Sequence, residues 1–69
     1  MPFVEIKLFE ERVDNASAAR LGVALTDAVC AVLGEQVRPS TWVVVSGVPA
    51  QRWTVAGSSA SAPTPARDS

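Results

Sequence analysis

Apolar and polar residues alternate near the start of the chain, in the segment Phe-Val-Glu-Ile-Lys-Leu-Phe at 3–9. Val4, Ile6 and Leu8 fall on one side of an extended chain, and the charged residues between them fall on the other. This period of two is typical of a half-buried β-strand. The sequence therefore predicts a strand over residues 3–9, and the charged run at 10–12 is expected to leave the sheet as a polar loop.

A long helix is predicted for residues 15–33, which are rich in Ala, Leu and Val. At 100° per residue, its apolar side chains form a stripe on the side opposite Arg20 and Asp27. Asp14 is a suitable amino-terminal cap, because its carboxylate can accept hydrogen bonds from the unpaired amides of the first turn. Gly34 is suited to end the helix, since a left-handed conformation costs glycine little. The stripe consists of Ala18, Leu21, Leu25, Ala28, Val29 and Val32.

A second strand is predicted after a loop that ends in Arg38-Pro39-Ser40. The segment Thr-Trp-Val-Val-Val-Ser at 41–46 is β-branched and apolar on both faces, as expected for a central strand covered on each side. Gly47 and Pro49 are expected to end this strand. Strand, helix and strand make a β-α-β unit, whose right-handed crossover makes the two strands parallel.

The predicted fold class is α/β, or α+β in the broader sense, with a single β-α-β unit in a domain at residues 1–57. Residues 52–55 are expected to form a short C-terminal hairpin arm. The remaining residues, 58–69, are rich in Ser, Ala and Pro and contain no large apolar side chain. Such a segment cannot contribute to a core, so we expect a disordered tail.

The small size of the chain favours an assembly of subunits. A domain of about 57 residues buries only about 60% of its unfolded-chain surface and is marginal as a monomer. The usual remedies are disulfides, a structural metal or oligomerisation. Cys30 is the single cysteine and the chain has no histidine, so neither an internal disulfide nor a zinc site is available. Hydrophobic residues make up 48% of the chain, and Val23 and Cys30 widen the apolar surface of the predicted helix beyond its stripe. We therefore expect an obligate oligomer.

The charge pattern argues against several classes of partner. The net charge is -1 and the six Lys and Arg residues are scattered, whereas a nucleic-acid interface needs clustered cations. No apolar run is expected to approach the roughly 20 residues of a membrane span. Charged residues near the N-terminus also interrupt the apolar core that a signal peptide needs. We expect a cytoplasmic protein, and the unpaired cysteine is consistent with a reducing compartment.

The second residue is the unusual feature of a chain that has no histidine for a triad, no Gly-rich phosphate loop and no Cys-X-X-Cys motif. Cys30 is better explained as a small packing residue than as a nucleophile. Removal of Met1 would leave Pro2 with a secondary amine at the N-terminus. A free α-amino group has a pKa of roughly 7.7–8.0, and an apolar pocket beside a cation lowers it further. Pro2 would then be a neutral base near physiological pH.

The order of elements around Pro2 resembles that of a known family. Pro2 starts a strand that ends in Leu-Phe-Glu-Glu-Arg at 8–12, a helix follows, and a second strand leads to Trp53 and Gly57. This pattern resembles the 4-oxalocrotonate tautomerase family, whose short subunits are built from a β-α-β unit. The resemblance covers residues 2–57 and rests on the proline, the arginine ten residues later and the aromatic residue followed by a glycine-containing turn.

The resemblance implies a role for each matching residue. Pro2 is the catalytic base, and Arg12 binds a substrate carboxylate and draws electrons away from it. Trp53 makes the pocket apolar, and the backbone amide near Phe9 contacts a substrate oxygen. A guanidinium fork suits a carboxylate, and fixed donors stabilise the charge of a dienolate as it develops. The implied partners are a small carboxylate substrate and further copies of the chain, most plausibly as a hexamer built as a trimer of dimers with sites between subunits.

The chain departs from the family at one important position. The founding members have a second arginine early in the second strand, where this chain has Trp42. The resemblance then implies that a dicarboxylate is a poor substrate and that Trp42 lines the pocket and desolvates Pro2. Arg52 could restore the missing charge from the hairpin, although an exposed, solvated arginine is the simpler interpretation.

The leading hypothesis is a cofactor-free keto–enol tautomerase acting on a small 2-oxo or enol monocarboxylic acid. Arg12 has a simpler explanation in a surface ion pair with Glu10 or Glu11, and Trp53 has one in an oligomer contact. A hydratase or dehalogenase of the same superfamily would need a carboxylate in the terminal arm, and none lies between residues 47 and 61. A third hypothesis is a tautomerase-like subunit with a structural role or a place in a hetero-oligomer.

Overall fold

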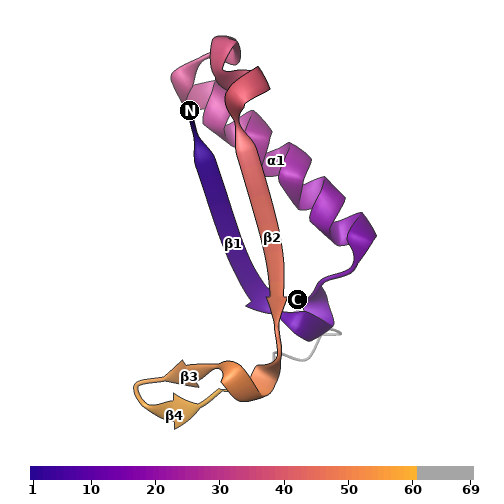
Figure 1. Ribbon diagram of the computed structural model, residues 1–69, viewed down its shortest axis with the longest axis vertical. Helices are drawn as coiled ribbons and strands as arrows, with labels where there is room; N and C mark the ends of the chain where they lie inside the picture. The colour runs from indigo at the N-terminus through magenta and orange to yellow at the C-terminus, as the bar shows by residue number, and fades with distance from the viewer. Residues whose placement is uncertain (61–69) are drawn as a thin grey trace.

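The computed structural model describes residues 1–60, which form one β-α-β unit followed by a small hairpin (Figure 1). The two long strands are parallel and hydrogen-bonded to each other, and the helix connects them. This arrangement confirms the predicted fold class. The three elements are β1 at Phe3–Phe9, α1 at Asn15–Leu33 and β2 at Trp42–Val48.

Both ends of α1 are capped as the sequence predicts. The Ser17 amide donates to Oδ1 of Asp14 at 2.7 Å, which satisfies one of the free amides of the first turn. Gly34 has a φ of 104°, and its amide donates to the Cys30 carbonyl at 2.8 Å. Segments expected as loops contain short 3-10 helices: η1 at Glu10–Arg12, η2 at Glu35–Ser40 and η3 at Ala50–Arg52.

Strand β2 runs two residues beyond its predicted end. Gly47 was expected to break the strand, but it pairs with Leu8, and Val48 pairs with Phe9. The glycine serves a different purpose here, because η1 passes close over it. A Cβ atom at position 47 would lie 3.2 Å from the Cα atom of Glu10.

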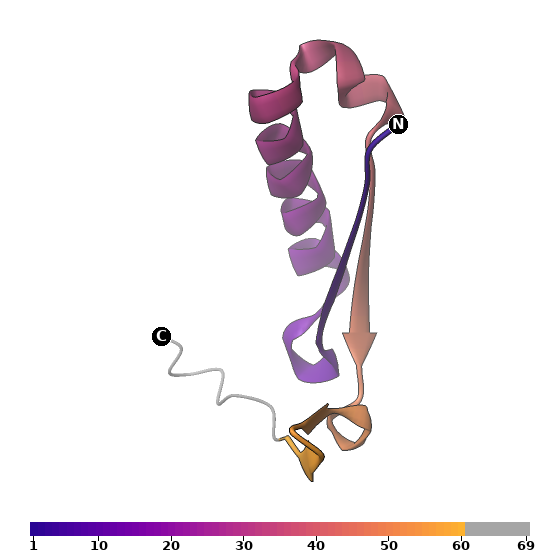
Figure 2. The ribbon, with the colours of Figure 1, turned by 90° about the vertical axis from the view of Figure 1, so that its left-hand side faces the viewer.

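The fold has two layers, with α1 against one face of the sheet (Figure 2). Val4, Ile6 and Leu8 are half-buried, while the residues between them are exposed, so the predicted alternation of β1 is confirmed. The predicted helical stripe is wrong at its C-terminal end. Cys30 is the most buried residue at 3% exposure, whereas Val32 is 82% exposed and Ala28 is also exposed. The buried side of the helix turns along its length because the strands beneath it twist and η2 packs against its last turns.

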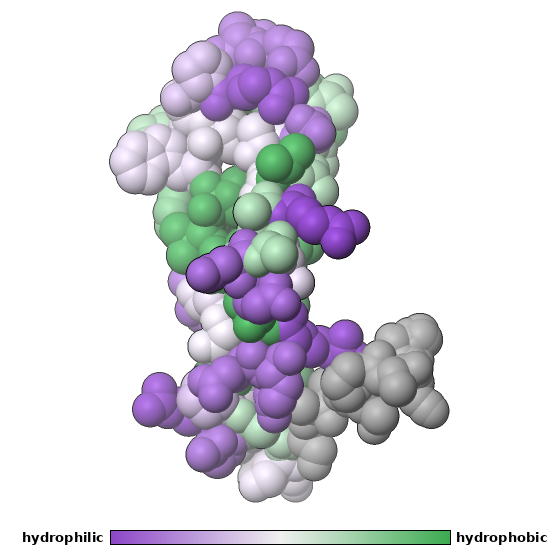
Figure 3. Space-filling view, turned by 90° about the vertical axis from the view of Figure 1, so that its right-hand side faces the viewer, coloured by the Kyte–Doolittle hydropathy of each residue, from purple (hydrophilic) through white to green (hydrophobic). Residues whose placement is uncertain are grey.

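Much apolar surface stays uncovered in the single chain. On the sheet face away from α1, Phe3 is 59% exposed, Trp42 is 58% exposed and Val44 is 41% exposed. The single chain therefore covers only one face of β2, whereas the sequence predicts a strand covered on both. Figure 3, which views the right-hand side of Figure 1, shows apolar side chains gathered at mid-height on that side. Among the hydrophobic residues at 1–60, only Cys30 is buried.

By length and composition alone, α1 could cross a membrane, contrary to the expectation that no apolar run approaches that length. This test is weak for a single helix, because a helix that packs in a protein core passes it as well. In the β-α-β unit, α1 contacts β2, and Leu21, Leu25 and Val29 are half-buried. The apolar side chains of α1 therefore contribute to its packing against the sheet.

The described part of the chain ends in a tight hairpin that projects from the β-α-β unit (Figure 1). Strand β3 spans Thr54–Val55, pairs antiparallel with β4 at Ser58–Ser59, and confirms the predicted arm. Ala56 and Gly57 form the turn with φ values of 53° and 84°, the pattern of a type I′ turn. Ser58 and Ser59, which the sequence placed in the tail, thus belong to the arm. The predicted disorder of residues 61–69 lies outside the described residues.

Candidate functional site

The six predicted site residues divide between two opposite ends of the sheet. The amino end, where both strands begin, carries Pro2 and Trp42. The carboxyl end, where both strands finish, carries Phe9, Arg12, Arg52 and Trp53. A strand rises about 3.3 Å per residue, so Pro2 and Phe9 are about 23 Å apart along β1. One chain therefore does not bring the predicted base and the predicted carboxylate-binding arginine together.

Pro2 is fixed at the first rung of the parallel ladder. Its carbonyl accepts a hydrogen bond from the Trp42 amide at 3.0 Å, and the residue is half-buried. Proline has no amide hydrogen, so the sheet makes no use of its nitrogen. While Met1 is present, that nitrogen belongs to the Met1–Pro2 peptide bond. Loss of Met1 would convert it into a positioned secondary amine.

Phe3 lies beside Trp42 at the amino end, although the sequence pattern did not single it out as a site residue. The two residues are register partners, so their side chains stand on the same face of the sheet. The alternation of β1 contained the signal, because it places Phe3 on the face of Glu5 and Lys7, where a large apolar ring is out of place. Both rings are more than half exposed.

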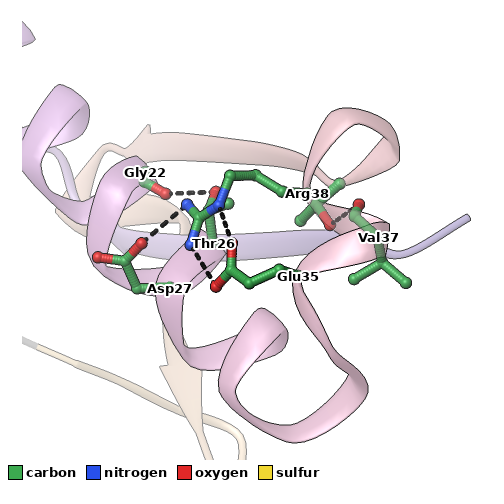
Figure 4. Close-up of polar contacts among 7 residues, drawn as sticks. Gly22, Thr26, Asp27, Glu35, Val37 and Arg38 are labelled. Carbon is green, nitrogen blue, oxygen red and sulfur yellow. Dashed lines mark hydrogen bonds and ion pairs between the residues drawn. The ribbon is translucent and has the colours of Figure 1, made fainter.

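Arg38 lies in η2 near the amino end, and each of its three guanidinium nitrogens donates to a carboxylate (Figure 4). Its Nε and Nη2 atoms donate to the two carboxylate oxygens of Glu35 at 2.8 and 3.0 Å, and Nη1 donates to Asp27 at 2.9 Å. These hydrogen bonds, that to Glu35 first, raise the pKa of Arg38 above its ordinary value. The contact with Arg38 in turn lowers the pKa of Glu35. Arg38 links η2 to α1, and its charge is already paired with two carboxylates, so it is poorly suited to replace the second arginine of the founding enzymes.

The carboxyl end is built around two stacked aromatic rings. The ring centroids of Phe9 and Trp53 are 4.5 Å apart, with an interplanar angle of 28°. The indole nitrogen of Trp53 donates to the Val48 carbonyl at 3.0 Å, which ties the ring to the last residue of β2. Trp53 therefore presents a fixed apolar wall at the base of the hairpin arm, and the aromatic side chain of Phe9 contributes to it.

Arg12 lies in η1 at the same end and is half-buried. Its Nε atom is buried and has no hydrogen-bond partner among the described residues. Within residues 1–60, Arg12 also makes no ion pair, so the simple pairing with Glu10 or Glu11 is not what the structure shows. A buried donor without an acceptor is costly, and a guanidinium fork is suited to a carboxylate. Arg12 is thus without an anionic partner among residues 1–60, as a group that binds an anionic ligand would be.

Arg52 lies in η3 with an exposed side chain. It makes no ion pair with any residue in the part of the chain that the structure describes. This is the solvated arginine of the simpler interpretation. For metals, residues 1–60 contain no group of three or more His, Cys, Asp or Glu side chains close enough to hold an ion.

Comparison with known proteins gives a consistent family match. Residues 2–62 match a family model described as "Tautomerase enzyme". The chain is also 43% identical over 70 residues to a protein of Ralstonia nicotianae named "Probable tautomerase", with 100% of this chain and 97% of the relative covered. No solved structure matches the chain. The family match starts at Pro2 and includes all six predicted site residues.

Proposed function

Because the chain belongs to the tautomerase family, we propose that it is a cofactor-free keto–enol tautomerase of the 4-oxalocrotonate tautomerase type. Its base is the nitrogen of Pro2 after removal of Met1, and its substrate is a small 2-oxo or enol monocarboxylic acid. The observation that carries the proposal is the state of Arg12. The guanidinium of this arginine, ten residues from Pro2, makes no ion pair with any described residue, so its charge is left for a substrate carboxylate.

The proposed reaction moves one proton and leaves the substrate's atoms otherwise unchanged. The lone pair of the Pro2 nitrogen takes the hydroxyl proton of the enol, and the electrons of the O–H bond form the ketone. The π electrons of the enol C=C bond move onto its far carbon and form a new C–H bond with the proton that the prolinium returns. Arg12 holds the carboxylate bidentately and stabilises the negative charge that develops between the two proton transfers.

The proposed site is shared between subunits. A substrate of this size cannot span the roughly 23 Å between Pro2 and the carboxyl end of the same strand. The amino end of one subunit must therefore meet the carboxyl end of another. The single chain buries few of its apolar side chains, which supports the same proposal. A domain of this size needs to bury more apolar surface to be stable. We propose a hexamer, built as a trimer of dimers.

Ketonisation of phenylenolpyruvate tests the assignment of roles. Pro2→Ala is expected to reduce kcat, because a primary amine on a flexible first residue replaces the positioned secondary amine of proline. Arg12→Ala is expected to raise KM strongly, because the carboxylate loses its anchor. Arg20→Ala is the matched control, since Arg20 is exposed on α1 and is not one of the predicted site residues. Full activity of both Pro2→Ala and Arg12→Ala would refute the roles of base and carboxylate anchor.

A second proposal is a subunit that becomes active only with a related partner chain. Trp42 at the position of the second arginine favours it, together with the full engagement of Arg38 by Glu35 and Asp27. The measurement that separates the two is activity of the purified chain alone. Activity without any other chain favours the first proposal, and activity gained only on mixing with a related subunit favours the second.

A further inference from the structure

We propose that Phe3 and Trp42 form the surface that binds the part of the substrate remote from its carboxylate, and that this part is a bulky apolar group, preferably an aromatic ring. The inference rests on the proposed function for the location of the site. It goes further by naming the substrate class and by giving Phe3 a role as a specificity-determining residue.

The two rings stand next to the proposed base. Phe3 follows Pro2 directly in the chain, and the Trp42 amide is hydrogen-bonded to the Pro2 carbonyl at 3.0 Å. Phe3 and Trp42 are register partners, so their side chains project side by side from one face of the sheet. A substrate whose reacting atom reaches the Pro2 nitrogen must place its neighbouring atoms close to this pair.

The rings are open for a ligand in the single chain. Phe3 is 59% exposed and Trp42 is 58% exposed. Aromatic side chains gain more from burial than other residues, and they pack well against the flat face or the edge of another ring. An aryl group is therefore the ligand that uses this surface best.

Charge at the amino end also favours an apolar group. Arg38 gives its guanidinium to Glu35 and Asp27, and Lys7, farther along the same face as Phe3, pairs with Glu5 at 2.8 Å. Among the side chains of residues 1–60, none near Pro2 offers an uncommitted cation to a second carboxylate. The carboxylate of the substrate goes to Arg12 of another subunit, so the remaining end of the molecule is left to the two rings.

The alternative occupant of this surface is a second copy of the chain. In that case Phe3 and Trp42 would be interface anchors, and their truncation would weaken the oligomer. Binding specificity and oligomeric state therefore have to be measured on the same variants.

The experiment compares the wild type with Phe3→Ala and Trp42→Ala. Val44→Ala is the matched control, because Val44 lies on the same face but one pair farther from Pro2. Calorimetry gives the affinity for phenylpyruvate and for 2-oxohexanedioate, a dicarboxylate of similar length. Ketonisation of phenylenolpyruvate gives KM and kcat, and sedimentation velocity gives the oligomeric state.

The wild type is expected to bind phenylpyruvate more tightly than the dicarboxylate. Each ring truncation should weaken phenylpyruvate binding and raise KM by about tenfold or more, with a smaller change in kcat, whereas Val44→Ala should change them little. Trp42→Arg should reverse the preference towards the dicarboxylate. The inference is overturned if the preference is unchanged in every variant, or if Phe3→Ala and Trp42→Ala dissociate the assembly. If Pro2→Ala loses turnover but Phe3→Ala and Trp42→Ala keep the wild-type preference for phenylpyruvate, this inference alone is contradicted. If Pro2→Ala is fully active, the proposed function is contradicted.

Discussion

Gly47 is the position at which the fold holds Arg12 in place, and Gly47→Ala tests this directly. Strand β2 carries Gly47 under η1, the short helix that ends in Arg12. An added Cβ atom would lie 3.2 Å from the Cα atom of Glu10 and 3.4 Å from the Cβ atom of Val13. Carbon atoms pack best at about 3.5–4.0 Å, so the backbone of η1 would have to move by a few tenths of an ångström.

The expected cost follows from this overlap. Inserting a methyl group into a tightly packed position typically costs about 1–3 kcal/mol. Gly22→Ala is a matched control of opposite sign, because a Cβ atom at Gly22 meets nothing within 4 Å. That substitution, in the middle of α1, should stabilise the protein by roughly 0.5–1 kcal/mol. Urea unfolding of both variants at one protomer concentration measures the difference, because an oligomer's stability depends on concentration.

Gly47→Ala should also change the kinetics in a specific way. A shifted η1 misplaces the Arg12 guanidinium, so KM should rise more than kcat falls, while Gly22→Ala should leave both near wild type. Wild-type stability and KM in Gly47→Ala would refute the view that contact between η1 and β2 positions Arg12. A loss of stability with unchanged KM would refute the link to Arg12 alone.

Two further predictions concern the ends of the fold. The hydrogen bond from the Ser17 amide lowers the pKa of Asp14 below 3.8, so the stability it contributes is full above that pH and is lost as the pH falls through the lower folded-state pKa. The thermal stability of Asp14→Asn should therefore fall less than that of the wild type below about pH 4, since asparagine caps a helix but does not titrate, and equal acid sensitivity would contradict this. Ala56 has a φ of 53°, a left-handed conformation that costs a residue with a Cβ atom about 1 kcal/mol. Ala56→Asn should stabilise the hairpin and Gly57→Ala should destabilise it, as measured by urea unfolding, and shifts of the same sign would rule out a type I′ turn as the source of the strain.

The sequence predicted the elements well because their signals are local. Alternation in β1 and the caps at Asp14 and Gly34 depend on residues close together in the chain. The side of α1 that is buried near Cys30 depends on how η2 folds back against the helix, and the role of Gly47 depends on η1, which is distant in the sequence. Periodicity in one segment cannot report such contacts.

The candidate site shows the same division. Its residues could be chosen from the sequence, and the predicted strand at 3–9 already separates Pro2 from Arg12. The pairing of β1 with β2 adds that Trp42 lies beside Phe3 at one end and Val48 beside Phe9 at the other. The engagement of Arg38 with Glu35 and Asp27 required side-chain positions and had no sequence signal of its own.

The central claim is that the nitrogen of Pro2 is the base, and the presence of Met1 tests it most directly. Two preparations of the same sequence are compared for phenylenolpyruvate ketonisation, one with Met1 removed and one with Met1 retained, as verified by intact-protein mass spectrometry. The processed protein should be faster by about 10²–10⁴-fold, because an amide nitrogen has no basic lone pair. Equal rates in the two preparations would contradict the assignment of Pro2 as the base.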